Sequence, residues 1–152
     1  MAIDLRRARS TEADQLTTIA IAAKRQWGYP DRWIDLWREQ LTIAADYIAA
    51  HEVYAATIDQ VIVGFYAVSD SGSISILDHL WVQPNSIGRG VGRRLLQHAI
   101  DQAKRSGAHS IEIESDPNAE GFYQHMGARR VSVKRHELEG QARELPVLRI
   151  DL

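Results

Sequence analysis

The chain of 152 residues contains no cysteine, little net charge and no long apolar run. Without cysteine it can form no disulfide, no thiolate nucleophile and no cysteine-ligated zinc site. No stretch approaches the roughly 20 apolar residues of a membrane-spanning helix, and the N-terminal MAIDLRRARS lacks the apolar core of a secretory signal. We therefore expect a cytoplasmic protein that does not enter a membrane.

The charge balance and the histidine spacing exclude further classes of protein. A formal net charge of -2 at pH 7 argues against a general binder of nucleic acid or of membrane surfaces. The six histidines are scattered without ligand spacing, so no metal site is predicted. No G-x-S-x-G element is present, which argues against a serine hydrolase.

The length and the 45% hydrophobic content fit one globular domain over residues 1–152. Alternating apolar patterns predict strands at 3–8, 52–57, 61–68, 75–82, 110–115, 130–138 and 146–152, the last two separated by a polar turn at 139–143. Helical spacing predicts a helix after Ser10 and Thr11, a second from Pro30 or Asp31, a third over 91–105 and a short one over 119–125. This order predicts an α/β or α+β sheet with helices on its faces.

The stretch from Leu80 to Ala103 combines an apolar strand end, three alternating glycines and an amphipathic helix. A helix N-terminus offers unpaired N–H groups and partial positive charge, and glycines let an anion approach the backbone closely. The loop IGRGVGR lacks the Gly-Lys-Ser/Thr of a Walker A motif and the glycine spacing of the dinucleotide fingerprint. It predicts a phosphate site, although a glycine-rich turn that only connects strand to helix has the same pattern.

Two segments resemble motifs of the GNAT N-acetyltransferase superfamily. LWVQPNSIGRGVGRRLL is similar to the acetyl-CoA-binding loop R/Q-x-x-G-x-G/A, with Gly90 and Gly92 on the small positions and Ile87 where Arg or Gln is usual. SDPNAEGFYQHMGARRV is similar to a later motif of the family, which Asn118, Tyr123 and Gly127 fit. The two segments follow each other in the order found in the family.

The resemblance implies a GNAT-like fold, namely a mixed, mostly antiparallel sheet flanked by helices on both faces. It implies acetyl-CoA as cosubstrate. The residues expected to hold acetyl-CoA are Leu80, Trp81, Val82, Ile87, Gly88, Arg89, Gly90, Val91, Gly92, Arg93 and Asn118. Of these, Leu80, Trp81 and Val82 would use their backbone groups, and Asn118 is equally explained as a turn residue after Pro117.

The resemblance also assigns chemical roles. It places Tyr123 beside the sulfur of CoA as a proton donor, where the alternative is an aromatic residue packed next to Phe122. The candidates for the general base are Glu114, then Asp78, then His79. Glu114 is equally consistent with a solvated face of its strand.

The acceptor is expected to be a small molecule with a primary amine. Trp27 and Tyr29, at a helix break, are predicted to shape its pocket together with His79, whereas the spacing of Trp33 and Trp37 indicates core packing. The alternatives are a non-catalytic acyl-CoA-binding module with the same fold and a nucleotide-binding protein. A homodimer through the β-rich C-terminal segment is a further expectation.

Overall fold

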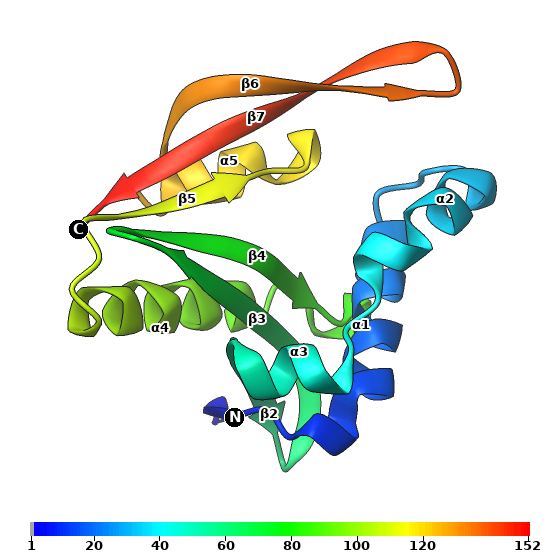
Figure 1. Ribbon diagram of the computed structural model, residues 1–152. Coiled ribbons are helices and arrows are strands. Elements are labelled where there is room, and N and C mark those ends of the chain that lie inside the picture. Colours follow the sequence, from blue (N-terminus) through cyan, green and yellow to red (C-terminus); the bar gives the residue numbers. More distant parts are fainter. Residues whose placement is uncertain (1) are drawn as a thin grey trace. The chain divides into compact units, whose positions relative to one another are not determined.

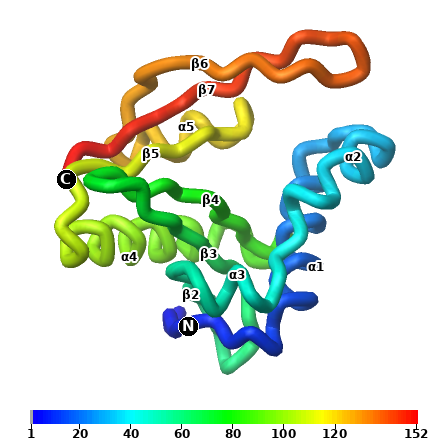
Figure 2. Tube along the Cα trace, viewed as in Figure 1, coloured from blue at the N-terminus to red at the C-terminus, as the bar shows by residue number. Residues whose placement is uncertain are grey.

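The computed structural model describes residues 2–152 and shows seven strands hydrogen-bonded in the order β1-β2-β3-β4-β5-β7-β6 (Figures 1 and 2). The strands are β1 (Asp4–Arg7), β2 (Glu52–Ile58), β3 (Val61–Ser71), β4 (Ile74–Val82), β5 (Ser110–Glu114), β6 (Arg129–Leu138) and β7 (Gln141–Asp151). The α-helices are α1 (Ala13–Arg25), α2 (Asp31–Leu41), α3 (Ala45–Ala50), α4 (Val91–Arg105) and α5 (Glu120–His125), with short 3₁₀ turns η1 (Ser10–Glu12), η2 (Pro84–Ser86) and η3 (Pro117–Ala119).

The sheet is mixed and mostly antiparallel, as the resemblance to the GNAT superfamily implies. The pairs β1–β2, β2–β3, β5–β7 and β6–β7 are antiparallel, whereas β4–β5 is parallel. A parallel pair needs a crossover connection, and α4 lies between β4 and β5 in the chain. The fold is therefore α+β with one βαβ unit.

Two features of the chain differ from the sequence prediction. The short helix α3 was not predicted. The stretch 139–143 is not a five-residue turn, because β7 already begins at Gln141 and only Glu139 and Gly140 turn the chain. Both have positive φ, 51° and 77°, as in the two-residue type I′ turn that keeps two strands paired to their ends.

The described residues form two compact units, of which the first contains residues 2–68 and 79–99. Its core is one cluster of buried apolar side chains from the helices and strands of this unit. Leu16, Ile19 and Ala20 of α1 pack there with Phe65 and Ala67 of β3. These residues recur at helical spacing and form the buried face of α1.

The opposite face of this part of the sheet is covered by α4. Gly64 and Tyr66 of β3 alternate with Phe65, so they point away from the cluster that contains α1. Tyr66 is hydrogen-bonded to His98 of α4, and an added Cβ on Gly64 would meet Leu95 of the same helix. Helices therefore flank both faces of the sheet in this unit, as expected.

The second unit contains residues 69–78 and 100–152. Its strands are β5, β6, β7 and the first half of β4, and α5 packs against β7. Ile111 and Ile113 of β5 and Leu148 of β7 are fully buried. In Figure 1 the β6–β7 hairpin (orange and red) extends well past the end of β5.

In the described part of the chain, residues 2–152, we find no helix with the length and apolar character needed to cross a membrane. Within these residues no group of three or more His, Asp or Glu side chains is arranged to hold a metal ion. The prediction of a single domain over 1–152 stays a prediction.

Candidate active site

The glycine-rich turn between η2 and α4 contains two glycines in the left-handed backbone conformation. Gly88 and Gly90 have φ values of +87° and +83°, in the left-handed region that favours glycine. A Cβ at either position would meet no heavy atom within 4 Å. The backbone of this turn is therefore open on the side where a side chain would otherwise stand.

The turn leads into the N-terminus of α4. The N–H of Arg94 donates to the carbonyl of Gly90 at 3.1 Å, so Val91, Gly92 and Arg93 precede the first such i→i−4 bond of the helix. Their N–H groups and the helix dipole favour an anion. Arg93 is exposed beside them and adds positive charge, whereas the Val91 side chain is buried.

Ile87 is the one residue of the turn that departs from the family motif. Its side chain is 53% exposed, and its N–H donates to the carbonyl of Pro84 at 3.3 Å. An apolar side chain cannot bond to a phosphate, so any anion held here depends on backbone N–H groups and on arginine.

Gly64 positions this turn, although it is not among the site residues predicted from the sequence. An added Cβ would lie 2.8 Å from the backbone oxygen of Trp81, 3.1 Å from Leu95 Cδ1 and 3.2 Å from Val91 Cγ1. Only glycine lets β3, the end of β4 and the first turn of α4 approach one another so closely. A glycine inside the otherwise apolar run 61–68 was the available signal.

His79 and Trp81 of β4 are linked by a hydrogen bond in which indole Nε1 donates to imidazole Nδ1 at 3.0 Å. Because the indole can only donate, Nδ1 must accept, and the proton of the neutral imidazole is on Nε2. Phe65 and Tyr47 lie beside the His79 ring, with centroids 6.2 and 6.1 Å away. This environment holds His79 in one tautomer and orientation.

In the second unit, Asp78 and Glu114 occupy neighbouring positions of the parallel strands β4 and β5. The pairing of these strands ends at Leu77 and Ile113, and the two carboxylates follow directly. Leu77 and Ile113 are buried, so Asp78 and Glu114 share the opposite face and are both exposed. The structure thus brings together the two leading candidates for the base.

The Glu114 carboxylate has partners on β6. One oxygen is 2.8 Å from His136 Nε2 and the other is 3.5 Å from Lys134 Nζ. Lys134 and His136 are two residues apart and lie on one face of the strand, which explains how both reach the same carboxylate. Neither partner was predicted, because the β6–β7 register that places them cannot be read from the sequence.

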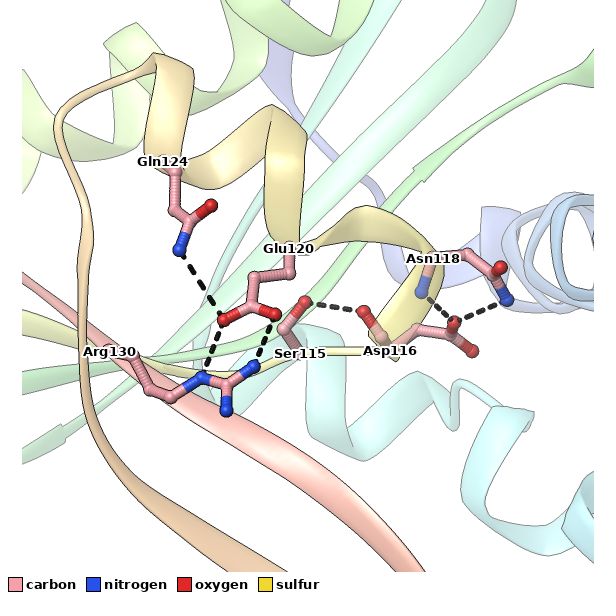
Figure 3. Close-up of polar contacts among 6 residues, drawn as sticks. All are labelled: Ser115, Asp116, Asn118, Glu120, Gln124 and Arg130. Carbon is pink, nitrogen blue, oxygen red and sulfur yellow. Dashed lines mark hydrogen bonds and ion pairs between the residues drawn. The ribbon is translucent and has the colours of Figure 1, made fainter.

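Asn118 lies in η3, directly before α5, in the close-up of Figure 3. Its N–H and its side-chain amide both donate to Asp116 Oδ1, at 2.8 and 3.0 Å. Asp116 thereby caps the turn, which Ser115 supports by donating to the Asp116 carbonyl at 2.7 Å. The geometry matches the alternative role of Asn118 as a turn residue.

The same figure shows how α5 is fixed to β6. The Arg130 guanidinium donates to both oxygens of Glu120, at 2.6 and 2.8 Å. This fork lowers the pKa of the Glu120 carboxyl, because the arginine favours the charged form. It anchors the helix that carries Tyr123.

Tyr123 is a buried residue of α5, with its ring edge-on to Phe122 at a centroid distance of 5.2 Å. Burial raises the pKa of its phenol far above the ordinary value, and the negative charge of Asp116 adds to the effect. The phenol therefore remains protonated over the whole physiological pH range. It can donate a hydrogen bond and cannot act as a base.

Tyr29, which precedes α2, forms one aromatic cluster with Trp33 and Trp37 of that helix. The ring centroid of Tyr29 lies 6.0 Å from that of Trp33 and 5.0 Å from that of Trp37. All three side chains are half-buried, whereas Trp27 is 44% exposed. Trp37 also packs against the core of the first unit, as its spacing predicts.

Known proteins resemble this chain along its whole length. The acetyltransferase (GNAT) domain model matches residues 33–140. The peptidyl-lysine N-acetyltransferase YjaB of Salmonella typhimurium is 28% identical over 99% of this chain and 98% of its own.

Two solved structures share the fold. A GCN5-related N-acetyltransferase from Rhodopseudomonas palustris superimposes with a TM-score of 0.81 at 21% identity, over 100% of this chain and 99% of that one. The PaiA N-acetyltransferase from Thermoplasma acidophilum, solved with coenzyme A, gives 0.79 at 18% identity over the full length of both chains. The chain therefore belongs to the GNAT family of acetyl-CoA-dependent N-acetyltransferases.

Proposed function

We propose that this enzyme transfers an acetyl group from acetyl-CoA directly to a primary amine of a small molecule, in a ternary complex of the enzyme with both substrates. The observation that carries this proposal is the open glycine turn with Gly88 and Gly90 in the left-handed region, directly before α4. Its backbone suits the pyrophosphate of acetyl-CoA. Leu80, Trp81 and Val82 of β4 would pair with the amide-rich pantetheine arm, as an added strand would.

The reaction begins with loss of a proton from the amine. An alkylamine with a pKa of about 10.4 is almost entirely protonated at pH 7, so forming the neutral amine costs roughly 4–5 kcal/mol. A carboxylate that accepts this proton lowers the barrier. We assign this role to Glu114 first and to Asp78 second, because both are exposed at the end of the β4–β5 pairing.

The contacts of Glu114 bear on its role. His136 donates a hydrogen bond to one of its oxygens and Lys134 forms an ion pair with the other, so an incoming ammonium would have to share the carboxylate with them. The acid limb of the pH–rate profile should therefore move in Glu114→Gln if Glu114 is the base, and in Asp78→Asn if Asp78 is.

The amine nitrogen then attacks the thioester carbon, the carbon–sulfur bond breaks, and CoA leaves as a thiolate. The Tyr123 phenol has a raised pKa, so complete proton transfer to a thiolate of pKa near ~8.5 is unfavourable. Tyr123 acts instead by donating a hydrogen bond to the sulfur as its charge develops. A hydrogen bond to a charged group contributes about 1.5–3 kcal/mol, or roughly 10- to 100-fold in kcat.

Release of free thiol from acetyl-CoA, measured with a panel of primary amines, tests the proposed function. We expect release that depends on the amine, together with intersecting initial-velocity lines when both substrates are varied. Parallel lines would indicate a covalent acetyl-enzyme and contradict direct transfer. Binding of acetyl-CoA without thiol release would indicate a binding module instead.

The acceptor class remains a proposal. The Salmonella relative is named for acetylation of peptidyl-lysine, which is also a primary amine, so a lysine-containing peptide belongs in the panel. The homodimer and the cytoplasmic location stay predictions.

A further inference from the structure

Of the 18 lysine and arginine residues of the chain, only Lys24, Lys104 and Lys134 are lysines. A lysine side chain ends in a primary amine, the group that the proposed function acetylates, whereas an arginine ends in a guanidinium that stays charged. The three lysines are therefore the candidate acceptors within the side chains of the enzyme itself, and their surroundings distinguish them.

Lys134 lies beside the carboxylate that we assign first as the base. Its Nζ is 3.5 Å from Glu114 Oε2, and both residues belong to the second unit. The strand that carries it, β6, is the last of the sheet and is hydrogen-bonded only to β7, and the Lys134 side chain is 59% exposed. An alkylammonium thus lies next to the atom that would receive the proton of an acceptor.

The ion pair positions Lys134 without holding it firmly. The Glu114 side chain is 37% exposed, and an ion pair between exposed side chains contributes only about 0–1 kcal/mol. The lysine ammonium is also carried on a flexible four-carbon stem. The amine can therefore move away from Glu114 once it has lost its proton to the carboxylate.

The other two lysines have different surroundings. Lys24 belongs to the first unit, and its Nζ lies 4.5 Å from the centroid of the Trp37 ring and 5.1 Å from that of Tyr29, where the rings favour the charged ammonium. Lys104 is exposed in the last turn of α4 and forms no ion pair with another residue of 2–152. Lys104 therefore serves as the reference for an exposed lysine without a neighbouring base.

We propose that the enzyme acetylates its own Lys134, with Glu114 as the proton acceptor. This inference rests on the proposed function. Glu114 takes a proton from the ammonium, and the neutral Nζ attacks the thioester carbon of acetyl-CoA, so that a carbon–nitrogen bond forms and the carbon–sulfur bond breaks. The nitrogen loses two protons in all, of which one ends on the thiol of CoA and the other passes from Glu114 to solvent.

The test uses the purified enzyme with acetyl-CoA and no added amine. Mass spectrometry of its peptides follows the acetylation of the three lysines with time. Acetylation of Lys134 should be at least about tenfold faster than that of Lys104, and its first-order rate constant should not depend on protein concentration, because the reaction occurs within one molecule. Equal rates at Lys134 and Lys104, or a rate constant that rises in proportion to protein concentration, would overturn the proposal.

Two glutamates of β5 supply the variant and its matched control. Glu114→Gln should lower the rate at Lys134 to that at Lys104, because the base is lost. Glu112 lies on the same face of β5, but its partner is Arg149 at 3.2 Å. Glu112→Gln should therefore leave acetylation of Lys134 at the wild-type rate, and an equal loss in both variants would reject Glu114 as the proton acceptor and overturn the proposal.

Transfer to added amines keeps this inference separate from the proposed function. Thiol release with an amine of the panel, together with no preference for Lys134 over Lys104, would remove the self-acetylation alone. No thiol release with any amine and an unmodified Lys134 would remove the proposed function as well.

Discussion

Gly64→Ala is the substitution for which the structure sets the most definite expectation. The new Cβ would lie 2.8 Å from the backbone oxygen of Trp81, which is closer than a Cβ normally approaches another heavy atom. This oxygen cannot rotate away as a side chain could, because β4 is tied to β3 by the Gln83 N–H, which donates to the Val63 carbonyl at 2.8 Å. The strands must therefore shift.

Overpacking of this kind costs about 1–3 kcal/mol. For a chain of this size each kcal/mol lowers Tm by roughly 2–4 °C, so thermal and urea unfolding both resolve the effect. The displaced atoms belong to Trp81 and to the first turn of α4, so the affinity for acetyl-CoA should fall as well. Isothermal titration with acetyl-CoA measures this second effect.

Gly121→Ala is the matched control. Gly121 lies in α5, its φ is not in the left-handed region, and an added Cβ would meet nothing within 4 Å. Alanine is the better helix former by up to about 1 kcal/mol, so this variant should be as stable as wild type or more stable. Equal stability of Gly64→Ala and Gly121→Ala would refute the argument from close approach.

Two further variants test the turn and the acid stability. Gly90→Ala should cost about 1–2 kcal/mol of backbone strain and weaken acetyl-CoA binding roughly tenfold. Gly107, which follows α4, has a similar φ of +85°, and Gly107→Ala should leave binding unchanged. Titration calorimetry measures both affinities, and an equal loss of acetyl-CoA affinity in the two variants would contradict a phosphate site at the glycine turn. Arg6 donates two hydrogen bonds to the Glu12 carboxylate and holds the pKa of that carboxyl below its ordinary value. This pair therefore stabilises the fold fully at a pH above the ordinary pKa of a glutamate, and the stabilisation is lost as the pH falls through the lowered pKa. Glu12→Gln should be less stable at pH 7 by about 1–2 kcal/mol and converge with wild type in acid. A difference between the urea midpoints of wild type and Glu12→Gln that stayed constant at every pH would disprove this linkage.

Much of the fold could be read from the sequence because its elements have strong local patterns. The apolar stripe of α4, from Val91 to Ala103, repeats at helical spacing and is buried throughout. The helix α3 was missed because six residues with one buried side chain, Ile48, are too short to show a period.

The site was predictable only where the backbone defines it. The glycine turn before α4 follows from local sequence, since positive φ favours glycine wherever it occurs. The partners of Glu114 and the position of Lys24 over Trp37 depend on strand register and on helix packing. Residues separated by 22 positions, such as Glu114 and His136, give no local signal of their contact.

The most direct test of the proposed function is a comparison of wild type with Tyr123→Phe. Purified protein is mixed with acetyl-CoA and an amine, and free thiol and acetylated amine are measured together. We predict equal amounts of both products for wild type, and about a 10- to 100-fold lower kcat for Tyr123→Phe with an unchanged KM for acetyl-CoA. An unchanged kcat across the pH range would contradict the role of Tyr123, and thiol release without acetylated amine would contradict the transfer itself.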